Sequence, residues 1–151
     1  MSESFPEQLG HQEILRATAR PEQLEAVMDW LAHRAETLGL DGALTLRMQL
    51  VLEELFLNTL LHGYAGDGDN IMELELKKTD PRHVWLVYTD YAPAFNPCEK
   101  LFGLAPADPE RLGGKGLYLI RDLSASVEYQ ALNPGNRIRL GFYLEAPRAQ
   151  E

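Results

Sequence analysis

The sequence predicts an α+β fold, a two-layer sandwich with helices on one face of a mixed, mostly antiparallel sheet. Three observations lead to this fold. Two stretches with apolar residues at helical spacing follow each other in the first 64 residues. Two pairs of stretches that alternate apolar and polar residues come after them. A long segment rich in proline and glycine separates the two pairs. We expect one domain over residues 1–151, with a core of about 11–145.

The chain opens with an expected strand and helix. Apolar and polar residues alternate loosely over residues 11–20, which indicates a strand. Pro21 suits the first turn of a helix, and apolar residues then recur at helical spacing as far as Ala35. We therefore expect an amphipathic helix over Pro21–Leu38, ending at Gly39.

A second helix is expected to start after Asp41, which can cap it, and to run to about His62 or Tyr64. It is apolar almost all round, which indicates a buried helix. Residues 65–70, rich in glycine and aspartate, then form a turn.

The remaining elements are strands and one short helix. Residues 71–78 and 83–89 alternate like paired strands around a turn at Asp80-Pro81. Residues 91–114 form a long loop, and such loops are usually functional. A helix is expected over residues 116–125. A hairpin across residues 133–136 then joins strands 126–132 and 137–144.

Composition limits the function classes. The formal net charge of −9 disfavours direct nucleic-acid binding. The single cysteine, Cys98, cannot form an internal disulfide, which fits a reducing compartment. Neither a signal peptide nor an apolar run of the ~20 residues that span a bilayer is evident. We expect a cytoplasmic protein without membrane contact.

Three motifs carry possible chemistry. On the second helix, Glu54, Asn58 and His62 recur every four residues and so share one face. An amide oxygen one turn from a carboxylate suits a Mg²⁺ ligand beside a proton acceptor. Asp90 ends a strand before small residues, where a carboxylate can accept a hydrogen bond from adenine. Gly113, Gly114 and Gly116, with Lys115, open a helix where an anion can bind.

Each motif taken alone has an ordinary structural explanation. These are a solvent-facing polar stripe, an Asx-type turn and a flexible lead into a helix. The order of all three motifs, with these elements between them, decides in favour of function.

This arrangement resembles the Bergerat ATP-binding fold of the histidine-kinase/gyrase (GHKL) superfamily. Within it, His62-Gly63-Tyr64, Phe95-Asn96-Pro97 and the run from Gly114 to Tyr129 look like the RsbW/SpoIIAB anti-sigma factor serine kinases. The resemblance extends from the first strand to about Leu144. It implies Glu54 as the catalytic base, Asn58 as the Mg²⁺ ligand and residues 96–112 as a lid over the nucleotide. The contacts to ATP implied in this way are Asn58, His62, Asp90, Ala92, Phe95, Gly113, Gly114, Lys115, Gly116 and Leu117.

The resemblance implies a serine/threonine protein kinase that uses ATP and Mg²⁺ and phosphorylates a STAS-domain anti-anti-sigma partner. It also implies a sigma factor as a second partner and a homodimer as an assembly. Ala92 stands where the family usually has glycine. This difference motivates an alternative, a non-catalytic switch that sequesters a partner. The catalytic domain of a sensor histidine kinase ranks lower, because no upstream helical hairpin carries a phospho-accepting histidine.

Overall fold

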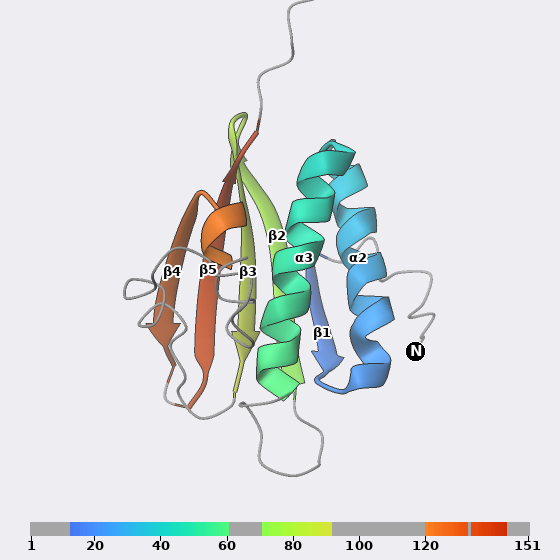
Figure 1. The fold of residues 1–151 in the computed structure, drawn as a ribbon, viewed down its shortest axis with the longest axis vertical. Coiled ribbons are helices and arrows are strands. Elements are labelled where there is room, and N and C mark those ends of the chain that lie inside the picture. Colours follow the sequence, from blue (N-terminus) through green and yellow to red (C-terminus); the bar gives the residue numbers. More distant parts are fainter. Residues whose placement is uncertain (1–12, 61–70, 92–119, 133, 145–151) are drawn as a thin grey trace, which may run out of the picture.

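A computed structural model describes residues 13–60, 71–91, 120–132 and 134–144. Five strands form one sheet in the order β1-β2-β3-β5-β4, and every neighbouring pair is antiparallel. Two long helices cover one face of this sheet (Figure 1). The expected two-layer α+β sandwich is therefore confirmed. The strands are β1 (Ile14–Thr18), β2 (Ile71–Asp80), β3 (His83–Asp90), β4 (Ser126–Ala131) and β5 (Asn136–Tyr143).

The first helix matches its expected boundaries. Pro21–Gln23 form a 3₁₀ turn, and α2 (Leu24–Thr37) continues from it. The chain then leaves the helix at Gly39, whose φ of 75° favours a residue without a side chain. Trp30 belongs to the buried face of α2 and is 1% exposed.

The second helix, α3 (Gly42–Asn58), begins at the expected cap. The Asp41 carboxylate accepts a hydrogen bond of 2.7 Å from the backbone N–H of Leu44. The α-helix ends at Asn58, and a π-type turn continues it through residues 59–60. The expected end at His62 or Tyr64 lies outside the described residues.

The expectation that α3 is a buried helix holds for one face only. Its inner face is buried, but Leu46, Leu50 and Leu57 are 57%, 38% and 37% exposed. The helix therefore has two apolar faces, one against the sheet and one outward. The apolar pattern could not distinguish this arrangement from full burial, because it records side-chain type and not neighbours.

The core lies between the helices and the sheet. In β2, Met72, Leu74 and Leu76 face the helices and are fully buried, while the residues between them lie on the other face. β3 continues the same alternation, because Leu74 pairs with Tyr88 and Met72 pairs with Asp90. Asp90 therefore ends its strand on the helix-facing side of the sheet.

Both expected hairpins form. β2 and β3 pair around a turn in which Asp80 accepts a hydrogen bond of 2.7 Å from the N–H of Arg82. β4 and β5 pair across residues 132–135. The helix expected over residues 116–125 is helical at 120–123, and Ala125 instead donates to the carbonyl of Gly141. Its first four expected residues lie outside the described part of the chain.

Candidate functional site

Asp90 is the central residue of the candidate site. Its side chain is 6% exposed, so its carboxylate is enclosed by protein. β3 ends here, at the end of the molecule where α3 also ends and where β5 begins (Figure 1). Three elements that are distant in sequence therefore meet around one buried carboxylate, which is costly unless polar groups stabilise it.

Two side chains donate hydrogen bonds to Asp90, one to each carboxylate oxygen. The hydroxyl of Thr59 lies 3.1 Å from Oδ2, and Nδ2 of Asn136 lies 2.9 Å from Oδ1. Both donors are themselves buried. Because each oxygen has its own donor, the plane of the carboxylate is fixed in space.

A tyrosine supports each of these two donors. The hydroxyl of Tyr88 lies 2.6 Å from Oγ1 of Thr59, and the hydroxyl of Tyr129 donates to Oδ1 of Asn136. The Thr59 hydroxyl also lies 3.1 Å from the carbonyl of Leu55. The Thr59 hydroxyl has one proton to donate, and a charged carboxylate is the stronger acceptor. Thr59 therefore donates to Asp90 and accepts from Tyr88. A continuous polar network thus runs from β3 and α3 through Asp90 to β5 and β4.

Gly135 brings the chain close to the backbone of Asp90. Its φ is 123°, and a Cβ atom placed on it would lie 2.7 Å from the carbonyl oxygen of Asp90. Only glycine allows this approach without displacing the backbone. The turn before β5 therefore lies in close contact with the end of β3.

Glu54 and Asn58 lie one turn apart on α3, and both are half-buried. Asn58 immediately precedes Thr59, whose hydroxyl contacts Asp90. Partial burial raises the pKa of Glu54 above the ordinary value of 4.5, and the nearby charge of Glu53 raises it further. Glu54 is consequently a stronger base than an exposed glutamate.

Three of the expected site residues, Glu54, Asn58 and Asp90, fall in the described part of the chain. Glu54 and Asn58 lie on α3, and the residue that follows Asn58 contacts Asp90. The other expected site residues lie outside the described part, namely His62, Ala92, Phe95, Gly113, Gly114, Lys115, Gly116 and Leu117. The described residues contain no group of three or more metal-ligating His, Cys, Asp or Glu side chains. No described helix is long and apolar enough to cross a membrane.

Sequence reasoning missed Thr59 and Asn136. Thr59 stands inside an apolar run and looks like a core residue, while Asn136 stands in a turn-like Asn-Pro-Gly-Asn segment. The register of β3 with β5 pairs Asn136 directly with Asp90, which is 46 positions earlier in the chain. That pairing reveals the role of Asn136, and the packing of the end of α3 against Asp90 reveals that of Thr59.

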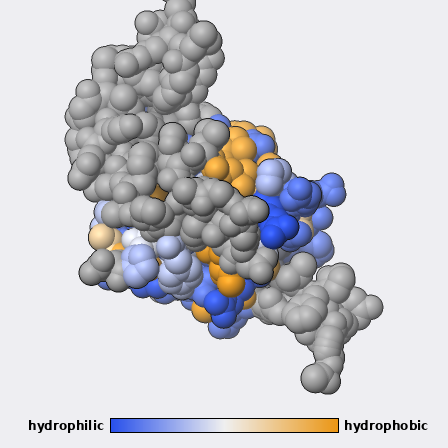
Figure 2. Space-filling model, turned by 90° about the horizontal axis from the view of Figure 1, so that it is seen from below, coloured by the Kyte–Doolittle hydropathy of each residue, from blue (hydrophilic) through white to orange (hydrophobic). Residues whose placement is uncertain are grey.

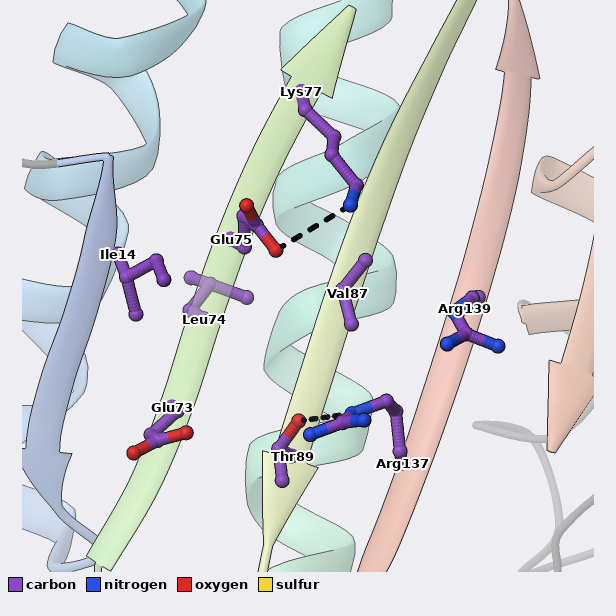
Figure 3. A pocket seen from close by; sticks show the side chains of 9 residues that line it. All are labelled: Ile14, Glu73, Leu74, Glu75, Lys77, Val87, Thr89, Arg137 and Arg139. Carbon is purple, nitrogen blue, oxygen red and sulfur yellow. Dashed lines mark hydrogen bonds and ion pairs between the residues drawn. The ribbon is translucent and has the colours of Figure 1, made fainter. Parts of the chain in front are cut away.

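Figure 2 shows the molecule from the end at which β3 finishes, where apolar and hydrophilic described residues are intermixed. A separate shallow hollow of about 220 Å³ lies on the sheet face opposite the helices (Figure 3). Its charges are mixed: Lys77 lies 3.7 Å from Glu75, and Arg137 donates to Thr89 over 3.2 Å. None of the expected site residues lines it. The candidate site lies on the helix side of the sheet, because Asp90 pairs with the helix-facing Met72.

Comparisons with known proteins agree with this fold. The model of the histidine kinase-like ATPase domain family matches residues 17–142. No curated protein gives a significant match.

Three solved structures share the fold at low sequence identity. The RsbU and RsbW domains of Rv1364c from Mycobacterium tuberculosis are 17% identical with a TM-score of 0.60, covering 90% of this chain and 34% of that one. A chain of the SiaB-SiaC complex from Pseudomonas aeruginosa is 13% identical with a TM-score of 0.60, covering 93% and 96%. The histidine kinase domain of a blue-light activated histidine kinase from Erythrobacter litoralis is 15% identical with a TM-score of 0.52, covering 92% and 71%. This chain thus spans about a third of the length of the Mycobacterium tuberculosis chain.

Proposed function

The chain belongs to the histidine kinase-like ATPase domain family, and we propose that it is an ATP-dependent serine/threonine protein kinase acting on a STAS-domain partner. When it is not bound to the STAS-domain partner, it binds a sigma factor. Family membership supports the binding of ATP. The RsbW-like motifs of the sequence support a STAS-domain protein as the partner. The single observation that carries the proposal concerns the carboxylate of Asp90. Hydrogen bonds hold it in a fixed orientation beside the end of α3, the helix that bears Glu54 and Asn58.

Asp90 recognises the adenine in this proposal. An ionised carboxylate only accepts hydrogen bonds, so it suits the exocyclic amine of adenine. Thr59 and Asn136 hold its two oxygens before the nucleotide arrives. Because the acceptor is already oriented, binding loses little entropy in ordering it.

Asn58 would hold Mg²⁺ through its amide oxygen. Mg²⁺ prefers oxygen ligands and is usually held by few protein groups together with phosphate oxygens and water. A half-buried amide next to the residue that contacts Asp90 fits this requirement. When bound, the ion neutralises charge on the phosphates.

Glu54 accepts the proton of the attacking hydroxyl. The oxygen of the partner's serine or threonine forms a bond to the γ-phosphorus as the bond to the β–γ bridging oxygen breaks, and ADP leaves. The hydroxyl proton moves to Glu54, whose raised pKa makes it a suitable acceptor.

The test combines the protein, ATP, Mg²⁺ and a STAS-domain protein encoded beside it, with phosphoserine and phosphothreonine measured by mass spectrometry. We expect transfer by the wild type, none by Glu54→Gln, and near wild-type transfer by the neighbouring control Glu53→Gln. ATP should bind to all three. Binding without transfer by the wild type would favour the non-catalytic switch. Full transfer by Glu54→Gln would refute the assignment of the base.

A further inference from the structure

Tyr129 on β4 is connected to Asp90 through the side chain of Asn136. Its hydroxyl donates to Oδ1 of Asn136, and Nδ2 of Asn136 donates to Oδ1 of Asp90 over 2.9 Å. The ring of Tyr129 is partly buried against the core, and Asn136 is buried. The hydroxyl therefore acts on the carboxylate through one intervening amide.

The hydroxyl and the carboxylate of Asp90 together fix the orientation of the Asn136 amide. An asparagine amide has a donor end and an acceptor end of almost the same shape. While Tyr129 donates to the oxygen, the nitrogen faces the carboxylate. Without the hydroxyl, the amide oxygen loses its donor, and only the carboxylate still orients the amide, so the amide is held less firmly.

The second carboxylate oxygen has separate support. Thr59 donates to Oδ2 of Asp90 from α3, and this contact does not pass through Tyr129. Loss of the Tyr129 hydroxyl therefore loosens one side of the carboxylate and leaves the other in place. The expected consequence is weaker base recognition in a protein that still folds.

We propose that Tyr129 is a positioning residue for purine recognition, because it fixes the Asn136 amide and through it the carboxylate of Asp90. The inference rests on the proposed function, in which Asp90 accepts from the exocyclic amine of adenine. A merely structural role of Tyr129 would weaken the binding of every nucleotide equally. A positioning role weakens only the nucleotide that carries the amine.

The experiment titrates two nucleotides with Mg²⁺ against the wild type and Tyr129→Phe. One is ATP, and the other is purine riboside triphosphate, which has hydrogen in place of the exocyclic amine. Tyr143→Phe is the matched control, because Tyr143 is 64% exposed at the far end of β5. If Tyr129→Phe does not fold, Asn136→Ala takes its place, since it removes the amide on which the hydroxyl acts.

We expect the wild type and Tyr143→Phe to bind ATP roughly tenfold more tightly than the analogue, as one charge-assisted hydrogen bond predicts. Tyr129→Phe should bind the analogue like the wild type and show little preference for ATP. If it prefers ATP by the wild-type factor, the positioning role is wrong and the proposed function stands. If the wild type itself binds neither nucleotide, or does not discriminate, the function of Asp90 fails and the inference fails with it.

Discussion

Thr59→Val tests the polar network around Asp90 at its most connected residue. The substitution replaces a hydroxyl by a methyl group of similar size, so it leaves no cavity. It removes the hydrogen bond of 3.1 Å to Oδ2 of Asp90 and the contact of 2.6 Å with the hydroxyl of Tyr88. All three side chains are buried, so water does not readily replace the lost partner.

The cost follows from the two contacts. A hydrogen bond to a charged group contributes about 1.5–3 kcal/mol, and a neutral one about 0.5–1.5 kcal/mol. We therefore expect Thr59→Val to lower the free energy of unfolding by about 2–4 kcal/mol. Urea unfolding at pH 7, followed by tryptophan fluorescence, measures this change, because Trp30 is buried in the folded protein.

A matched control and a double variant sharpen the test. Thr45→Val makes the same change on the same helix, where the hydroxyl donates to the backbone carbonyl of exposed Asp41. It should cost less than about 0.5 kcal/mol. Tyr88→Phe combined with Thr59→Val should cost less than the sum of the single changes, because both remove one shared contact. A loss below about 0.5 kcal/mol for Thr59→Val, or strict additivity, would refute the network.

Four further predictions concern Glu54, Gly135 and Asp41. Phosphotransfer should fall as the pH drops through the raised pKa of Glu54, beginning above 4.5. Ionised Glu54 opposes folding above that pKa, so Glu54→Gln should be more stable than the wild type at pH 8 and lose this advantage at pH 4. Equal melting temperatures of the two proteins at both pH values would contradict this prediction. Gly135→Ala should weaken both folding and ATP binding, because its Cβ would lie 2.7 Å from the carbonyl of Asp90; unchanged calorimetric titrations would exclude this. Asp41→Ala should cost about 0.5–2 kcal/mol in urea unfolding, since Leu44 loses its cap; a neutral result would argue against the cap.

Much of the fold was predictable because amphipathic periodicity is local. The helix at Pro21–Leu38, the cap at Asp41 and both hairpins depend on residues close together in sequence. The outward leucines of α3 were not predictable, because a helix with two apolar faces has the same composition as a buried one. The sheet order, in which β5 lies between β3 and β4, depends on contacts between distant segments.

The candidate site also contains some residues that the sequence predicted and others that it did not. Glu54 and Asn58 stand out by their four-residue spacing in an apolar helix, and Asp90 stands out at the end of an apolar strand. Thr59 and Asn136 do not stand out, because a threonine in a core run and an asparagine in a turn are ordinary. Their importance arises from strand register and from the packing of α3 on the sheet, which no short sequence window contains.

The most direct measurement is the calorimetric titration of ATP and Mg²⁺ into the wild type, Asp90→Asn and Asp80→Asn. Asp80 is an exposed carboxylate at the end of β2 and serves as the matched control. We predict that the wild type and Asp80→Asn bind alike, while Asp90→Asn binds at least roughly tenfold more weakly, as loss of a charged acceptor requires. Equal affinity of Asp90→Asn and the wild type would contradict the assignment of this carboxylate to the nucleotide.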